Sequence, residues 1–141
     1  MIGILVVSHG GLANELVDSA FRIVGEKVPG VQPLCIGWGL ESEDARQLIA
    51  AGIKELKKES DRILILTDLF GGTPTNLAMT FYEPGELEIL TGVNLPILIK
   101  AIMTVKKEAG LADLVGMLRE KGQKAIVSVS EALENEASGE K

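Results

Sequence analysis

The chain has very few of the side chains that bind metals or form disulfides. Among its 141 residues there is one cysteine, Cys35, and one histidine, His9. A single cysteine excludes an intrachain disulfide and a cysteine-based metal cluster. A total of one cysteine and one histidine argues against a zinc site. Cys35 stands in an apolar, strand-like run, which favours a buried and inert thiol. We therefore expect no metal site.

Aromatic residues and long apolar runs are also scarce. Aromatic residues make up 4% of the chain, so the core has to be built from Leu, Ile, Val and Ala. No apolar run reaches the roughly 18–20 residues of a membrane span, and the longest, near 95–105, is interrupted by Lys100. No basic stretch precedes an apolar segment at the N-terminus, as it would in a signal peptide. The sequence predicts a cytoplasmic protein with no membrane insertion.

Basic residues are outnumbered by acidic ones. There are 14 Lys and Arg against 20 Asp and Glu, which gives a formal net charge of −6. Binding to nucleic acid requires a basic surface, so this class of function is excluded. An acidic surface fits a partner that presents a basic one, since complementary fields steer encounter. The same charge also serves solubility alone, and both interpretations stay open.

Apolar runs and amphipathic stretches alternate along the chain, within a length that suits one domain. Alternation of this kind predicts an α/β fold, with a doubly wound, mostly parallel sheet and helices on both faces. Ser42 and Thr73 are expected as N-caps, the latter before Pro74. The expected strands are 2–8, 31–37, 62–67, 86–91 and 125–129; the expected helices are 11–26, 42–58, 74 onward, 96–105 and 110–121.

The expected helix after Pro96 is apolar on nearly all sides. Its residues between 97 and 105 are almost all aliphatic. A helix of this kind has to be buried on more than one side. In a chain of this size, a subunit interface is a reasonable way to bury it. The segment from 135 to 141 is polar and is expected to fray.

Three glycine-containing loops follow the expected strands and carry the polar residues of a candidate site. They span residues 8–11, 68–73 and 91–94. The carboxyl ends of parallel strands lie at one edge of a sheet, where such folds bind ligands. Glycine lets backbone N–H groups approach a ligand closely, and helix N-termini bind anions such as phosphate. The sequence therefore predicts an anion-binding site at this edge.

His9 is the best candidate for chemistry at this edge, because it ends the first apolar strand and precedes a glycine turn. Asp68 is placed to accept a hydrogen bond from its Nδ1, which would leave Nε2 free to attack. The hydroxyl of Thr73 is placed to donate to a bound oxyanion. Phosphoryl transfer onto Nε2 suits this set, since it depends mostly on positioning and charge stabilisation. The groups expected around the phosphoryl are Gly10, Gly71, Gly72, Thr73 and Asn94.

Each of these residues also has a plain structural interpretation. His9 and Asp68 would satisfy backbone groups in their turns, and residues 71–74 would form only a tight strand-to-helix turn. Asn76 and Asn94 would stabilise turns. Trp38 is either an anchor for a partner or a side chain packed over the sheet edge, and packing is favoured. Dinucleotide-binding, Walker-type and nucleophile-elbow motifs are all missing, and no arginine adjoins His9.

Three segments, in this order and spacing, resemble the mannose-family IIA component of the bacterial phosphoenolpyruvate:sugar phosphotransferase system. They are Ser8-His9-Gly10, the run from Asp68 to Asn76 with its Gly-Gly-Thr-Pro-Thr-Asn, and Thr91 to Pro96 with its Gly-Val-Asn-Leu-Pro. The resemblance covers about residues 1–130 and leaves 131–141 as a polar, acidic tail. The related dihydroxyacetone-kinase phosphocarrier subunit ranks lower, because it is not expected to carry the Gly-Gly-Thr-Pro-Thr-Asn segment.

The resemblance implies a phosphohistidine carrier. His9 would take a phosphoryl group from the phosphocarrier HPr and pass it to a histidine of a IIB component; Asp68 would orient His9, and Thr73 would lie beside the phosphoryl group. No metal or organic cofactor is implied. A homodimer is implied in which the last strand, here 125–129, is exchanged between subunits and runs antiparallel to the rest.

Some features depart from the family pattern or leave function open. Many relatives continue into a IIB domain, which is not found here, so the IIB partner is expected to be a separate protein. Position 70 is Phe, where some relatives have Trp. One alternative is a regulatory module, in which the phosphorylation state of His9 controls a partner without sugar transport. Another is an α/β domain that binds a small ligand without phosphorylation. The sugar cannot be read from a component that never touches it.

Overall fold

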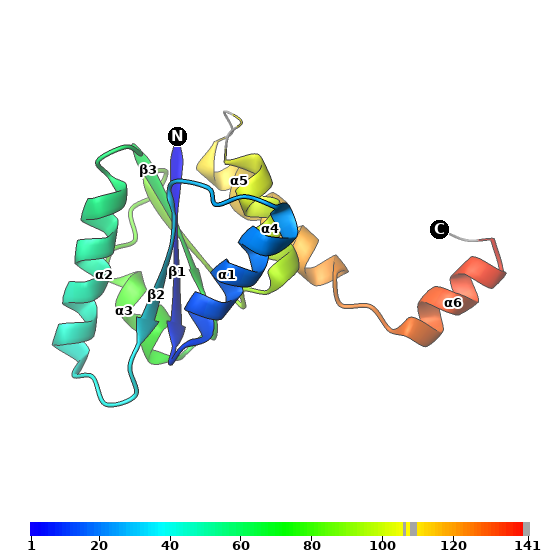
Figure 1. Cartoon of the computed structure of the whole chain (residues 1–141), viewed down its shortest axis with the longest axis horizontal. Coiled ribbons are helices and arrows are strands. Elements are labelled where there is room, and N and C mark those ends of the chain that lie inside the picture. The colour runs from blue at the N-terminus through cyan, green and yellow to red at the C-terminus, as the bar shows by residue number, and fades with distance from the viewer. Residues whose placement is uncertain (106, 108–109, 140–141) are drawn as a thin grey trace.

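The chain forms a parallel β-sheet with helices on both faces, as Figure 1 shows in a computed structural model that describes residues 1–105, 107 and 110–139. The sheet order is β2-β1-β3-β4, and each neighbouring pair is parallel. The central strands are nearly all buried, which explains their uninterrupted apolar sequences. The predicted α/β class is confirmed. The strands are β1 (Ile2–His9), β2 (Val31–Ile36), β3 (Arg62–Thr67) and β4 (Leu87–Thr91).

The helices are α1 (Leu12–Val24), α2 (Ser42–Leu56), α3 (Thr73–Met79), α4 (Leu95–Thr104), α5 (Leu111–Lys124) and α6 (Val129–Ala137). Helices α1, α4 and α5 cover one face of the sheet, and α2 and α3 cover the other. Alternate side chains of β1 point to opposite faces of the sheet. Val6 packs against α1, α4 and α5, and Val7 packs against α2 and α3. This double cover buries both faces and leaves the strand ends open.

Helix α4 is buried on more than one side, as its sequence predicts. It lies between α1 and α5, and Leu98, Ala101 and Ile102 are fully buried. The single chain therefore covers this helix without help from a second subunit. Cys35, expected to be buried, is only half-buried, because it lies on β2 at the edge of the sheet. Among the residues described, no helix is both long and apolar enough to cross a membrane.

The expected strand at 125–129 is wrong for the single chain. Ala125 caps α5, residues 126–128 have no regular structure, and Val129 begins α6. The chain leaves the sheet at this point (Figure 1), and Ile126 is 83% exposed. A strand needs a neighbouring edge for its backbone hydrogen bonds, and here the segment meets none. Its antiparallel exchange between subunits stays a prediction.

Three smaller expectations also differ from the structure. Helices α2 and α3 are capped by Glu41 and Gly72 rather than by Ser42 and Thr73, since Glu41 O and Gly72 O already accept the first helical hydrogen bonds. The polar C-terminal segment, expected to fray from residue 135, is helical up to Ala137. Residues 140 and 141, which belong to the expected tail, lie outside the described residues. The division into a domain of 1–130 and a tail of 131–141 stays a prediction.

Candidate functional site

The strand ends meet at one edge of the sheet, and this edge carries the candidate site. In the register of the sheet, Val7 is paired with Thr67, Thr67 with Thr91, and His9 with Ile36. From β1 the chain crosses to β2 on one side, while β3 pairs with the other side of β1. This is the point at which doubly wound sheets open a crevice for ligands. His9 ends β1 and Asp68 follows β3, so the two residues become neighbours.

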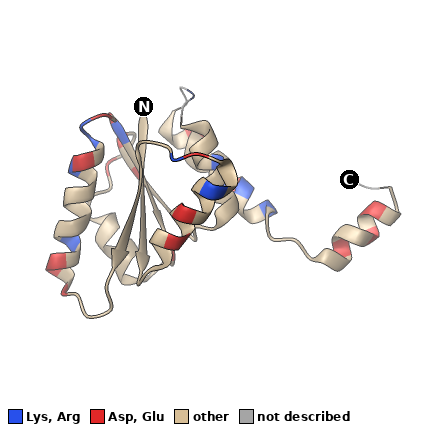
Figure 2. Cartoon of the chain, viewed as in Figure 1, with Lys and Arg blue, Asp and Glu red and all other residues tan. Residues whose placement is uncertain are grey.

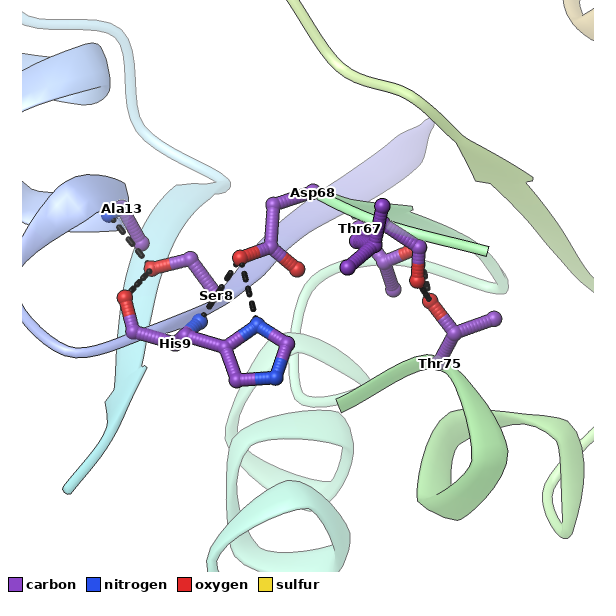
Figure 3. Close-up of polar contacts among 7 residues, drawn as sticks. Ser8, His9, Ala13, Thr67, Asp68 and Thr75 are labelled. Atoms are coloured by element: carbon purple, nitrogen blue, oxygen red, sulfur yellow. Dashed lines mark hydrogen bonds and ion pairs between the residues drawn. The ribbon is translucent and has the colours of Figure 1, made fainter. Parts of the chain in front are cut away.

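His9 and Asp68 are joined by two hydrogen bonds, shown in Figure 3. Nδ1 of His9 lies 2.9 Å from Oδ2 of Asp68, and the backbone N–H of His9 donates to the same oxygen, also at 2.9 Å. A carboxylate only accepts, so Nδ1 carries the proton of a neutral ring and Nε2 carries the lone pair. The side chains are 26% and 11% exposed. The pair presents a nucleophilic nitrogen with a fixed tautomer.

The second carboxylate oxygen of Asp68 lacks a partner. Oδ1 is buried and accepts no hydrogen bond within the part of the chain that the structure describes. A buried carboxylate with an unpaired oxygen is costly unless a positive charge lies close to it. The ring of His9 is the group beside it, so the carboxylate presents its negative charge to that ring.

Ser8 fixes the turn that follows His9. Its hydroxyl donates to the backbone oxygen of His9 at 3.1 Å and accepts from the N–H of Ala13 at 2.7 Å (Figure 3). Gly11, at the N-cap of α1, has no side chain to cap the helix. Ser8 therefore does this from the preceding strand, which connects the start of α1 to His9.

Thr75 fixes the loop that carries Asp68. Its Oγ1 lies 2.7 Å from Oγ1 of Thr67 and donates to the backbone oxygen of Leu69 at 2.6 Å. These contacts connect the end of β3, the loop and the first turn of α3. Figure 3 shows these contacts on the side of Asp68 away from Ser8. Each partner of the His9–Asp68 pair is thus held by its own hydroxyl contact.

Gly72 lies against the free edge of the His9 ring. A Cβ built on Gly72 would lie 2.6 Å from Cε1 and 3.2 Å from Nε2 of His9, which is too close for any other residue type without a shift of the ring. Its φ is −82°, so the requirement for glycine comes from the close approach and not from the backbone conformation. The backbone of Gly72, in the Gly-Gly-Thr-Pro loop, therefore lies close to the nitrogen that Asp68 leaves free.

Trp38 lies at the site, where the sequence did not place it. Its ring stacks on that of His9, with centroids 5.5 Å apart and planes inclined by 23°. Packing over the sheet edge is the favoured prediction from the sequence, but the residue is 79% exposed and its ring covers His9 instead. One signal was available: Trp38 stands two residues after β2, between Gly37 and Gly39, at the same edge of the sheet as His9.

The pair opens into a shallow cavity of about 620 Å³. Its walls are mostly apolar, and the acidic residues Glu15, Glu43 and Asp44 lie in the first turns of α1 and α2, as Figure 2 shows in red. These two helices begin just after the His9 turn and the Trp38 turn. The cavity is lined by His9, Gly10, Gly11, Leu12, Trp38, Asp68 and Leu69.

The remaining predicted residues lie farther from the ring. The side chain of Asn94 accepts a hydrogen bond from the N–H of Ile97 at 2.9 Å and so caps α4. This contact agrees with the alternative in which Asn94 stabilises a turn. Gly71 has a φ of +84° and accepts from the side chain of Asn76 at 3.4 Å, and Thr73 begins α3. None of Gly71, Thr73 and Asn94 is among the residues that line the cavity. Within the described ranges, no three His, Cys, Asp or Glu side chains gather as a metal site.

The fold and the site define a doubly wound α/β domain with one histidine–aspartate pair at the carboxyl edge of its sheet. The chain belongs to the mannose-type EIIA family: the family's sequence model, described as "PTS system fructose IIA component", matches residues 3–119. The predicted resemblance is thus confirmed. Members of this family are phosphotransfer components of the sugar phosphotransferase system, and this chain is one of them.

Individual relatives agree with this membership. The chain is 31% identical over 136 residues to the fructose-specific EIIA component of Bacillus subtilis (strain 168), covering 95% of this chain and 90% of the relative. It is 28% identical over 130 residues to the mannose-specific EIIAB component of Escherichia coli (strain K12), covering 89% of this chain but only 38% of that longer protein.

Solved structures match along almost the whole chain. The IIA protein associated with the fucose utilization operon of Streptococcus pneumoniae superposes with a TM-score of 0.83 at 28% identity, covering 94% of this chain and 96% of that one. The EIIA component of Streptococcus agalactiae superposes with a TM-score of 0.80 at 28% identity, covering 93% and 99%. The parallel sheet and its helices are therefore the family fold.

Proposed function

We propose that this protein is a phosphohistidine carrier, which accepts a phosphoryl group from HPr on His9 and passes it to a separate IIB component. The observation that carries the proposal is the 2.9 Å contact between Nδ1 of His9 and Oδ2 of Asp68 at the open edge of the sheet. It holds the proton on Nδ1 and leaves Nε2 as the nucleophile. His9 itself carries the group, so the transfer needs no metal and no organic cofactor.

The transfer follows from the charges of the site. The lone pair of Nε2 forms the new N–P bond, while the N–P bond of the donor histidine breaks and its electrons return to the donor nitrogen. The His9 ring, which keeps its Nδ1 proton, gains positive charge during this step. The carboxylate of Asp68 stabilises that charge, as positioned charges do in other phosphoryl transfers. The same steps in reverse deliver the group to the IIB histidine.

Backbone and hydroxyl groups around His9 would hold the phosphoryl oxygens. We assign this role to Gly10, Gly71, Gly72, Thr73 and Asn94. The approach of Gly72 to Nε2 supports it most directly, since only a residue without a side chain leaves room for the group there. The start of α3 at Thr73 adds the N-terminal end of a helix, which favours a negative charge.

The surface around His9 suits a partner with a basic rim and an apolar centre. Leu12, Trp38 and Leu69 are exposed at the cavity. Acidic residues lie in the first turns of α1 and α2, red in Figure 2. A protein donor that docks by apolar contact and is steered by opposite charge fits this pattern. We propose that HPr and IIB use this face in turn, in the cytoplasm.

We also propose a homodimer. The arm, residues 126–139, exposes Ile126, Val127 and Val129 and lines an open cavity of about 530 Å³. Strand β4 is the edge strand on its side of the sheet among the described residues. If residues 125–129 of a second copy paired with β4 as an antiparallel strand, the exposed apolar side chains of that segment would be covered. The free backbone edge of β4 would also be paired.

The first experiment is incubation with phosphoenolpyruvate, enzyme I and HPr, followed by intact-mass measurement. We expect one phosphoryl group per chain, labile in acid and lost in the His9→Ala variant. Absence of the group with an HPr that phosphorylates another IIA protein would contradict the proposal. A group that persists in His9→Ala would place the acceptor elsewhere.

The second experiment distinguishes carriage from regulation. The phosphorylated protein is mixed with purified IIB components of the mannose family, and loss of the group from His9 is followed by mass. Transfer to a IIB histidine supports the carrier. Phosphorylation without transfer to any of them would favour the regulatory module, in which the state of His9 controls another protein. Binding of a small ligand that survives His9→Ala, without phosphorylation, would favour the third alternative.

A further inference from the structure

Trp38 covers one face of the nucleophilic ring without being buried itself. Its indole stacks on His9 at 5.5 Å with planes inclined by 23°, yet 79% of the side chain is exposed. A tryptophan that only filled the core would hide its surface among aliphatic side chains. Here the main contact is an imidazole, so the position of Trp38 concerns the ring of His9.

The backbone of two neighbouring loops places Trp38 over His9. The N–H of Gly10 donates to the oxygen of Ile36 at 2.9 Å, which joins the loop after β1 to the loop after β2. The N–H of Leu40 donates to the oxygen of Gly37 at 3.2 Å and closes a tight turn that presents Trp38. The stack is therefore held by the sheet register and by two main-chain hydrogen bonds.

Gly10 provides the space that the indole occupies. Its φ is +51°, a conformation that favours glycine, and a Cβ at this position would lie 2.9 Å from Nε1 of Trp38. The residue after His9 thus lacks a side chain in the place where Trp38 lies. This contact is independent of the ring stack and points to the same arrangement.

The other contacts of His9 leave the tilt of its ring undetermined. Asp68 holds Nδ1 at one point, and Gly72 limits the edge that carries Cε1 and Nε2. The hydrogen bond at Nδ1 resists large rotations of the ring about its bond to Cβ, but small rotations only bend that hydrogen bond. A flat aromatic face against the ring restricts this rotation, because a tilt of the imidazole would drive it into the indole.

We propose that Trp38 is a positioning residue for His9, which aligns Nε2 for phosphoryl transfer and stabilises the charge that the ring gains. This inference rests on the proposed function and adds a residue to it. As the N–P bond forms, the ring becomes an imidazolium that keeps its Nδ1 proton. The indole face lies within the roughly 6 Å at which an aromatic ring attracts a cation. Asp68 acts on that charge from the edge of the ring, and Trp38 acts from its face.

The test uses a small chemical donor, so that ring alignment is measured apart from protein docking. With phosphoramidate, the P–N bond of the reagent breaks, ammonia leaves, and the phosphoryl group is bonded to the imidazole nitrogen. The chain has one histidine, so every phosphohistidine formed is on His9. Rates for wild type, Trp38→Ala and Trp38→Phe are measured by mass, and phosphorus NMR identifies the nitrogen that is modified.

We expect Trp38→Ala to slow phosphorylation by about 5- to 10-fold with phosphoramidate and with phospho-HPr alike. Wild type and Trp38→Ala should both give the Nε2 isomer, because Asp68 still holds the proton on Nδ1. Trp38→Phe, which keeps an aromatic face, should restore most of the rate. Ile23→Ala, which removes an exposed apolar side chain at the far end of α1, should leave the rate unchanged.

Equal rates in wild type and Trp38→Ala with phosphoramidate would overturn the inference. In particular, a loss seen only with phospho-HPr would make Trp38 a contact for the partner and not a positioning residue. Wild type could also fail to accept a phosphoryl group from phospho-HPr and still react with phosphoramidate at Nε2, at a rate that depends on Trp38. This result would contradict the proposed carrier function and would support the role of Trp38 in positioning His9.

Fluorescence gives a readout that needs no phosphoryl donor. Trp38 is the only tryptophan of the chain, so the emission of the protein reports on its surroundings alone. We expect His9→Ala to change the emission intensity and to make Trp38 more accessible to acrylamide quenching, since one face of the indole loses its cover. Identical emission and quenching in wild type and His9→Ala would show that the stack is missing in solution, and would overturn the inference.

Discussion

Asp68 uses one oxygen on His9 and leaves the other buried without a partner among the described residues. This arrangement places negative charge beside the ring, which would stabilise the positive charge that develops on a phosphoryl acceptor during the transfer. A carboxylate kept mainly for stability would be expected to have both oxygens hydrogen-bonded. We therefore assign Asp68 to the transfer itself.

The prediction for Asp68 concerns rate and not folding. Asp68→Ala should slow phosphorylation of His9 by phospho-HPr by about 10²-fold, because positive charge on the ring is no longer stabilised. Quench-flow with mass detection measures the rate, and circular dichroism checks the fold. Asp68→Asn serves as the matched control, since it keeps the shape and a hydrogen bond but not the charge. Unchanged kinetics in both variants would remove Asp68 from the mechanism.

Gly72 offers a test of close approach at the free edge of the ring. In Gly72→Ala the new methyl group would lie 2.6 Å from Cε1 of His9, so the ring has to move. A displacement of about 1 Å costs on the order of 10² in rate. The backbone at Gly72 accepts alanine, so the melting temperature should change little.

The control for Gly72 is Gly116→Ala on α5. A methyl group there meets no atom within 4 Å, and alanine should stabilise the helix slightly. Its phosphorylation rate should equal that of wild type. If Gly72→Ala accepted the phosphoryl group as fast as Gly116→Ala, the approach of Gly72 to Nε2 would have no part in the transfer.

At the scale of the elements, the site depends on the loops that connect β1 to α1 and β3 to α3. A buried hydroxyl holds each loop in place: that of Ser8 between β1 and α1, and that of Thr75 between β3 and α3. These hydroxyls bind backbone groups that a loop would otherwise leave unpaired. The His9–Asp68 pair is therefore held between segments that these hydrogen bonds fix.

Ser8→Ala tests one of these contacts. The variant leaves the buried N–H of Ala13 without an acceptor, so stability should fall by about 1 kcal/mol, as for the loss of a helix cap. Urea unfolding measures the loss, and hydrogen exchange at the amide of Ala13 should accelerate. Ser8→Thr keeps the hydroxyl and serves as the control for the cap. An unchanged exchange rate at Ala13 in Ser8→Ala would mean that Ser8 does not cap α1.

At the scale of the whole molecule, the sheet body and the arm differ in character. The body buries its apolar side chains in two cores, whereas α6 buries none of its residues. Figure 1 shows this helix standing away from the sheet. Apolar side chains exposed on an extended arm are typical of a segment that packs against another chain.

Sedimentation equilibrium tests the proposed homodimer. We expect wild type to sediment at twice the chain mass of 15.0 kDa at micromolar concentration. Val127→Asp, which places a charge on the apolar arm, should shift the protein towards the monomer. Ile23→Asp, an equally exposed apolar position on α1, should leave the dimer intact. A wild type that sediments as a monomer would contradict the exchange of residues 125–129.

Much of the fold and part of the site could be predicted from the local sequence. Continuous apolar runs such as 63–66 identify buried parallel strands, and glycine or proline stands at the start of α1, α3, α4 and α5. Alternation of strands and helices requires crossovers, which bring the strand ends to one edge. His9 and Asp68 each follow such a strand, so their proximity followed from the sequence together with the family resemblance.

The tertiary structure decided what depends on contacts between distant segments. The order β2-β1-β3-β4 brings Trp38 over His9, although 29 positions separate them, and no local pattern shows which way that side chain turns. The approach of Gly72 to Nε2 is likewise set by packing. Residues 125–129 have the composition of a strand, yet strand pairing is a property of two segments and not of one. The sequence by itself determined which helices and strands form and which loops lie at the same edge of the sheet. Long-range packing placed these loops relative to one another, and this placement decided which side chains contact His9.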